Sequence, residues 1–276
     1  MVVLTLLVIA AVAAGCGGDE PTDPAADAGP VHVHGLGINP ADGSLYVATH
    51  TGMFRMAEGS EDAERVGDSY QDTMGFTVVG ADRFLGSGHP DLRTDLPPLL
   101  GLIRSSDAGR SWQPVSLLGE ADFHALRADG SRVLGYDASG DRLMGSIDGG
   151  RTWTSQRPPA PLADVVAHPD GPGRLVAASE AGLISSRNGG RTWTAPQGVA
   201  VALAWPSPDA LYALGPKGTV SRSRDAGASW TEVGSAPGEP AALTAIDDGT
   251  LIVALHDGSF AHTTDAGRSW APGVWP

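Results

Sequence analysis

Histidines are the residues with the clearest chemical potential in this 276-residue chain. Eight are present, and five of them stand at the beginning or end of short apolar runs that we predict to be β-strands: His34, His50, His89, His124 and His256. Neutral imidazoles bind zinc, copper, iron and manganese, and an imidazole titrates close to neutral pH, which suits general acid–base catalysis. We predict that these five side chains form a metal or acid–base site, with the metal unspecified.

Four carboxylates fall close to the same strand ends: Asp91, Asp137, Glu180 and Asp257. Carboxylate oxygens complement imidazole nitrogens around a transition metal. Two carboxylates on either side of a sugar linkage are also the machinery of a retaining or an inverting glycosidase. All four are candidates for catalysis, and Asp91, Asp137 and Glu180 also join the histidines in the predicted functional surface.

An internal repeat indicates which elements position these side chains. The pattern Ser/Thr-x-Asp/Asn-x-Gly-x-Ser/Thr-Trp occurs five times, and its tryptophans are 41, 40, 37 and 40 residues apart. A short side-chain acceptor can bind backbone N–H groups of its own turn, the glycine permits a positive φ, and the tryptophan can pack between adjacent sheets. The repeated acceptor and tryptophan pairs are Asp107 and Trp112, Asp148 and Trp153, Asn188 and Trp193, Asp225 and Trp230, and Asp265 and Trp270.

These segments resemble Asp boxes, the hairpin signature of sialidase-type and sortilin-type β-propellers. The chain is similar to the secreted bacterial Asp-box proteins that are commonly labelled glycosyl hydrolases or exo-sialidases. The resemblance implies that the boxes are structural and lie at the turn between the third and fourth strand of each blade. It does not select an activity, because the same fold hosts hydrolases, lectin-like binders, photosystem assembly factors and sorting receptors.

Residue-by-residue comparison with true sialidases leaves the enzymatic activity open. The Arg-Ile-Pro motif of their first blade is absent, and the nearest feature is the segment 53–56, Met-Phe-Arg-Met. A sialidase also clamps its substrate's carboxylate with three arginines. Here only Arg93, Arg142 and Arg157 are expected to reach the appropriate face, and their spacing defines no such triad.

The length fits a ring of six units. Val31 to Pro276 is 246 residues, and a four-stranded blade needs about 40 residues, which predicts an all-β, six-bladed β-propeller with four-stranded antiparallel blades. Because strands alternate in direction, the boxes mark one face of the ring. The five histidines and four carboxylates then map to the opposite face, close to the central channel.

The N-terminal segment is predicted to direct the chain out of the cytoplasm. Residues 2–14 are an uncharged apolar run, long enough for a secretory signal but short for a membrane span. The small residues before Cys16 resemble a bacterial lipobox, so we predict a signal peptide over residues 1–15 and lipidation at Cys16. We expect residues 16–30 to be a disordered acidic Pro/Gly linker. An ordinary signal peptide and a secreted protein are the alternative.

Composition limits the partners. The chain has 18 basic and 32 acidic residues and a net charge of −14, so it is expected to repel the phosphate backbone of nucleic acid. A single cysteine excludes an intramolecular disulfide. We expect a monomer that contacts the membrane only through its lipid. Its ligand on the channel face is a small molecule, a glycan or another envelope protein.

Three functions follow from these features. The first is a cell-surface propeller with a His/carboxylate site that binds a metal or a small ligand, with or without hydrolytic activity. The second is a sialidase-like glycoside hydrolase that uses a pair of carboxylates. The third is a non-catalytic scaffold that binds proteins of the cell envelope.

Overall fold

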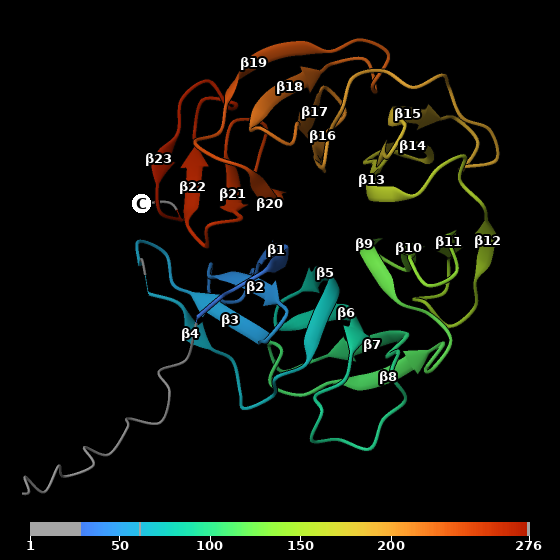
Figure 1. The fold of residues 1–276 in the computed structure, drawn as a ribbon, viewed down its shortest axis with the longest axis vertical. Coiled ribbons are helices and arrows are strands. Elements are labelled where there is room, and N and C mark those ends of the chain that lie inside the picture. The colour runs from blue at the N-terminus through green and yellow to red at the C-terminus, as the bar shows by residue number, and fades with distance from the viewer. Residues whose placement is uncertain (1–28, 61, 275–276) are drawn as a thin grey trace, which may run out of the picture.

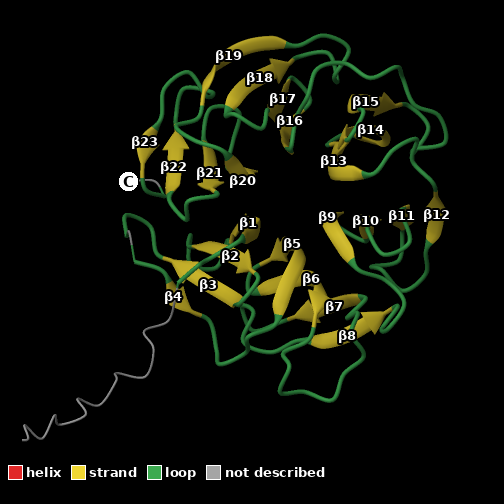
Figure 2. Ribbon diagram, viewed as in Figure 1, coloured by secondary structure: helices red, strands yellow, loops and turns green. Residues whose placement is uncertain are grey.

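The computed structural model describes residues 29–60 and 62–274, which form six antiparallel sheets arranged as a ring (Figure 1). Its described residues contain strands, turns and loops but no helix (Figure 2), so none is available there to cross a membrane. The predicted all-β, six-bladed propeller is confirmed. The signal peptide, Cys16 and most of the linker lie outside the described residues.

Each blade is built from consecutive strands, numbered outward from the channel in chain order. The first three blades comprise β1 (Val33–Ile38), β2 (Leu45–Thr49), β3 (Gly52–Met56) and β4 (Glu64–Arg65); β5 (Asp72–Gly80), β6 (Arg83–His89), β7 (Leu102–Ser105) and β8 (Gln113–Ser116); and β9 (Phe123–Asp129), β10 (Arg132–Asp137), β11 (Arg142–Ser146) and β12 (Thr154–Gln156). The last three comprise β13 (Leu162–His168), β14 (Gly171–Ser179) and β15 (Gly182–Ser186); β16 (Ala202–Ser207), β17 (Ala210–Leu214), β18 (Thr219–Ser223) and β19 (Thr231–Ser235); and β20 (Pro240–Ala245), β21 (Leu251–Leu255), β22 (Phe260–Thr263) and β23 (Ala271–Pro272).

Two features of the ring depart from a simple repetition. In the fourth blade the outermost position is held by one isolated bridge between Leu183 and Gln197 in place of a full strand. The ring closes without strand exchange, because β1 stays in the first sheet and packs against β20 of the last one. Side chains of both blades share one buried apolar cluster there, which includes Val33, Ile252 and Phe260.

The five repeat turns, at residues 105–112, 146–153, 186–193, 223–230 and 263–270, share one hydrogen-bond pattern. In the second repeat turn the Ser146 hydroxyl donates to Asp148 Oδ1 at 2.8 Å and accepts the Gly150 N–H at 2.9 Å. Asp148 in turn accepts the Thr152 N–H and hydroxyl at 2.9 and 2.7 Å. The short carboxylate therefore closes its own turn, as the sequence pattern predicts.

The repeat turns also fix neighbouring blades to one another. Gly150 has a φ of +82°, and a Cβ at this position would lie 2.1 Å from Leu102 of the preceding blade. The Trp153 ring stacks on Phe123 with 5.0 Å between centroids and joins an apolar cluster that spans the second and third blades. Amides of the repeat turns donate to the loops between the first two strands, for example Gly149 to Ser131 at 2.8 Å, so both kinds of turn share one face.

The repeat-turn carboxylates make the fold sensitive to acid. Hydrogen bonds from Ser229 and Ser269 lower the pKa values of Asp225 and Asp265, each to about 2. These values lie below the ordinary pKa near 3.9 of an unfolded chain, so the ionised carboxylates stabilise the fold above about pH 4 and lose this effect as the pH falls towards 2.

We therefore expect Asp225→Asn to lower the melting temperature near pH 6, and the difference from the natural chain to shrink as the pH falls to 2. Thermal melts monitored by circular dichroism across this range measure the effect. Asn188→Asp is the matched control and should gain stability near pH 6 but not at pH 2. A difference that stays constant with pH would contradict the argument.

Candidate functional site

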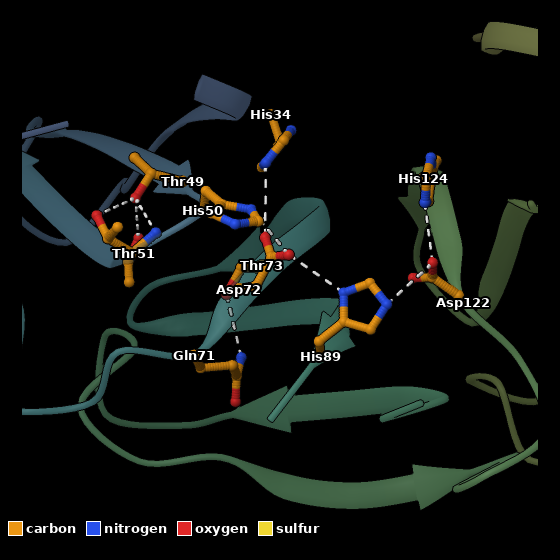
Figure 3. Close-up of polar contacts among 11 residues, drawn as sticks. His34, Thr49, His50, Thr51, Gln71, Asp72, Thr73, His89, Asp122 and His124 are labelled. Atoms are coloured by element: carbon orange, nitrogen blue, oxygen red, sulfur yellow. Dashed lines mark hydrogen bonds and ion pairs between the residues drawn. The ribbon is translucent and has the colours of Figure 1, made fainter. Parts of the chain in front are cut away.

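Four of the five predicted histidines gather around two aspartates on the face opposite the repeat turns (Figure 3). They come from the first three blades, where strands begin or end at this face. We call this group the His/Asp cluster; it consists of His34, His50, Asp72, His89, Asp122 and His124.

Asp72, the first residue of β5, is the centre of one half of the cluster. Its Oδ2 lies 3.0 Å from His50 Nδ1 and 3.1 Å from His89 Nδ1. Its Oδ1 lies 3.5 Å from His34 Nε2, and neither of these two buried atoms has a hydrogen-bond partner. A buried carboxylate oxygen and a buried imidazole nitrogen that face each other and lack hydrogen-bond partners are donor atoms available to a cation.

Donor atoms from His34, His50 and Asp72 all lie within 4.8 Å of one another. Their side chains are 23%, 58% and 13% exposed, so the group is reachable from solvent while its carboxylate is largely covered. Imidazole and carboxylate are ligand types shared by zinc, copper, iron and manganese sites. This half of the cluster thus has the composition and spacing of a three-ligand metal site.

Asp122, directly before β9, is the centre of the other half. Its Oδ2 accepts a hydrogen bond from His124 Nε2 at 2.9 Å and lies 3.7 Å from His89 Nε2. Its backbone N–H donates to Asp137 Oδ1 at 2.9 Å. Asp137 is fully buried, and its Oδ2 accepts a hydrogen bond from Arg142 Nε at 2.8 Å. Asp137 therefore positions the backbone that carries Asp122.

The pKa values of His34 and Asp137 are both shifted downward, which favours a neutral His34 imidazole and an ionised Asp137 carboxylate. Burial lowers the pKa of His34 below its ordinary value against the opposing charge of Asp72, with nearby histidines adding to the decrease. His34 is therefore neutral near pH 7 and has a lone pair to offer. Burial raises the pKa of Asp137, but hydrogen bonds from Asp122, Ser139 and Arg142 outweigh it, so that pKa lies below its ordinary value.

His256, the fifth predicted histidine, lies apart from the cluster. It is exposed, and its backbone N–H donates to the Glu239 carbonyl, just as the backbone N–H of His50 donates to the His32 carbonyl. The two histidines thus occupy matching positions in the sixth and first blades. His50 meets Asp72 of the next blade, whereas the register position of Asp72 is taken by His32 in the blade that follows His256. His32 carries no carboxylate, so the ion pair between His50 and Asp72 has no counterpart at His256 among the described residues.

The four candidate carboxylates do not form a pair. Asp91 accepts the Tyr70 N–H at 2.8 Å and binds Arg93 at 2.9 Å, and this arginine holds its pKa well below the ordinary range. Asp137 is engaged by Arg142. Glu180 is exposed, and Asp257 accepts hydrogen bonds from Ser259 within its own turn. Asp91 and Asp137 act as supports for the loops near the His/Asp cluster.

A cavity of about 910 Å³ runs along the channel, and His34 and His124 line one end of it. Part of its wall is an ion pair between Arg127 and Asp164, 2.7 Å apart, and Asp164 also accepts the Leu203 N–H at 2.8 Å. This contact ties three consecutive blades together. The His/Asp cluster thus sits where a small ligand in the channel would reach it.

Asp72 and Asp122 are the two central residues that the sequence analysis missed. Each had a detectable signal. Asp122 precedes His124 by two positions, so both side chains project from the same side of an extended segment. Asp72 begins the inner strand of the second blade, the position at which the first blade has His32 to His34.

Comparison with solved structures defines the class as a β-propeller. Similar structures include a GH74 enzyme from Niastella koreensis (TM-score 0.63, 16% identity, covering 90% of this chain and 46% of that one) and an ancestral GH74 enzyme (0.60, 14%, 89% and 39%). YCF48 from Cyanidioschyzon merolae is also similar (0.54, 14%, 87% and 84%). The chain spans less than half the length of these GH74 enzymes. No family model matches it, and neither does any curated protein.

The support of Asp122 by Asp137 is testable. Asp137→Ala leaves the Asp122 N–H and the half-exposed Arg142 without their acceptor, which we expect to cost about 2 kcal/mol of unfolding free energy. Urea denaturation measures the change. Asp257→Ala, which removes an exposed carboxylate from the same face, should leave the midpoint unchanged. Equal midpoints for both variants would show that Asp137 has no such role.

Proposed function

We propose that the protein is an extracytoplasmic, lipid-anchored propeller that binds a divalent transition metal ion through His34, His50 and Asp72. The observation that carries the proposal is the contact between two buried atoms without partners, Asp72 Oδ1 and His34 Nε2, beside the His50 nitrogen. An ion among them would supply the positive charge that the carboxylate lacks. Zinc, copper, iron and manganese all suit this donor set.

Three protein ligands leave a coordination position for water or substrate, which is how metal-dependent hydrolases are arranged. One of the three ligands, His34, lines the channel cavity, so a small ligand there could complete the coordination. Hydrolysis at this ion is therefore the reaction class that the proposed site supports. The repeat turns support the further proposal that the chain belongs with Asp-box propellers. The lipid anchor at Cys16 follows from the sequence resemblance alone.

Glycoside hydrolysis through a carboxylate pair has less support. Two of the similar structures are described as GH74 enzymes, but at identities of 14–16% this similarity shows the fold alone. Asp91 and Asp137 are each held by an arginine, and Glu180 and Asp257 lie exposed. A protein-binding scaffold is a third option, since one similar structure is described as YCF48 bound to D1 peptide.

Metal analysis tests the proposal. The full chain in mild detergent would be dialysed against Zn²⁺, Cu²⁺ or Mn²⁺ and analysed by inductively coupled plasma mass spectrometry. We expect at least one tightly held equivalent of one of these ions. Asp72→Asn and His34→Gln each remove a ligand and should lower the affinity for that ion by at least about 100-fold. Even residues that only hydrogen-bond to metal ligands contribute about 10–100-fold to the affinity.

His256→Gln is the matched control because it alters an exposed histidine at the same place in another blade. It should bind metal as the natural chain does. Circular dichroism melts would establish that every variant is folded. The proposal fails if the natural chain retains none of the ions, or if Asp72→Asn and His34→Gln bind as tightly as the natural chain.

A further inference from the structure

His89 lies between two carboxylates and has one proton for both of them. Its Nδ1 is 3.1 Å from Asp72 Oδ2, and its Nε2 is 3.7 Å from Asp122 Oδ2. A neutral imidazole carries a single N–H. When Nδ1 donates that hydrogen to Asp72, the Nε2 lone pair faces the Asp122 carboxylate, and two electron-rich atoms are left opposite each other.

Asp122 itself lacks a fixed positive partner. Its side chain is only 7% exposed, and its Oδ1 has no hydrogen-bond partner. The ion-pair partners that the described residues give Asp72 and Asp122 are all histidines, with no lysine or arginine among them. A buried carboxylate is costly without compensation, so this second carboxylate requires a cation as the first one does.

From these contacts we infer that the His/Asp cluster holds a second divalent transition metal ion, bound by His89 Nε2, Asp122 and His124. This inference deepens the proposed function, since the two ions share one cluster. His89 separates them, with Nδ1–H directed to the carboxylate of the first site and Nε2 to the second ion. His124 binds through a deprotonated ring nitrogen and gives up its hydrogen bond to Asp122.

The two sites differ in how closely their ligands are placed. The donors of His34, His50 and Asp72 already lie within 4.8 Å of one another, a spacing that the set of His89, Asp122 and His124 does not meet. His124 Nε2 already lies 2.9 Å from Asp122 Oδ2, so His89 Nε2, which is 3.7 Å away on a 42% exposed side chain, is the donor that must move closer. Because this movement has a cost, the second ion binds more weakly than the first.

The number of bound ions tests the inference. Equilibrium dialysis of the full chain against Zn²⁺ should show two equivalents that bind in two steps, the second at least about tenfold weaker. Asp122→Asn and His124→Gln should each remove the weaker step and retain the tighter one. Asp72→Asn should remove the tighter step. Asp257→Asn changes an exposed carboxylate on the same face and should leave both steps intact.

A spectroscopic measurement reports proximity independently of stoichiometry. With two equivalents of Cu²⁺, the electron paramagnetic resonance spectrum of the natural chain should be broadened by coupling between the ions, and Asp122→Asn should restore the narrow spectrum of an isolated ion. A single equivalent that Asp72→Asn abolishes and Asp122→Asn leaves unchanged would overturn the second site alone. Absence of any bound ion would overturn the proposed function as well.

Discussion

The hydrogen bonds that close the repeat turns are the interaction on which the rest of the structure depends. A hydroxyl donates to a carboxylate or amide oxygen two residues later, and that oxygen in turn accepts backbone N–H groups, as for Ser223 and Asp225. The closed turn places the glycine at its fifth position against a side chain of the preceding blade. Hydrogen bonds within an eight-residue turn thereby set the contact between two consecutive sheets.

The ring brings the corresponding strand ends of successive repeats together on one face. Because each inner strand begins at the same face, residues about 40 positions apart in sequence meet close to the axis. Three consecutive blades contribute to the His/Asp cluster, and the remaining three present other residues at the matching positions. The first blade illustrates the rule, since His32 takes the register position of Asp72 there and offers His256 no carboxylate. The cluster is therefore a local specialisation of an otherwise repetitive ring.

The repeat made the fold predictable, while the site depended on finer detail. Spacing and residue type at the turns predict six antiparallel blades because the pattern combines an acceptor, a flexible residue and a large aromatic side chain. The same spacing assigns His34, His50, His89 and His124 to one face. It cannot tell which strand-end side chains turn inward, because that depends on what the adjacent blade presents. Asp72 and Asp122 were missed for this reason, although the alternation from Asp122 to His124 was visible.

Asp137 shows why a residue that looks catalytic in sequence can be structural. It ends β10 as His89 ends β6, but one register position earlier, because Asp137 pairs with Phe123 whereas His89 pairs with Asp72. In the third blade, however, Arg142 and the Asp122 amide consume its oxygens. Its carboxylate therefore pairs with Arg142 and holds the backbone of Asp122. Among the described residues, the buried carboxylate oxygens without a hydrogen-bond partner belong to Asp72 and Asp122, and the ion-pair partners of both residues are histidines. This face places four imidazoles around the two carboxylates. Since the chain also has a net charge of −14, its electrostatic potential favours the binding of cations there.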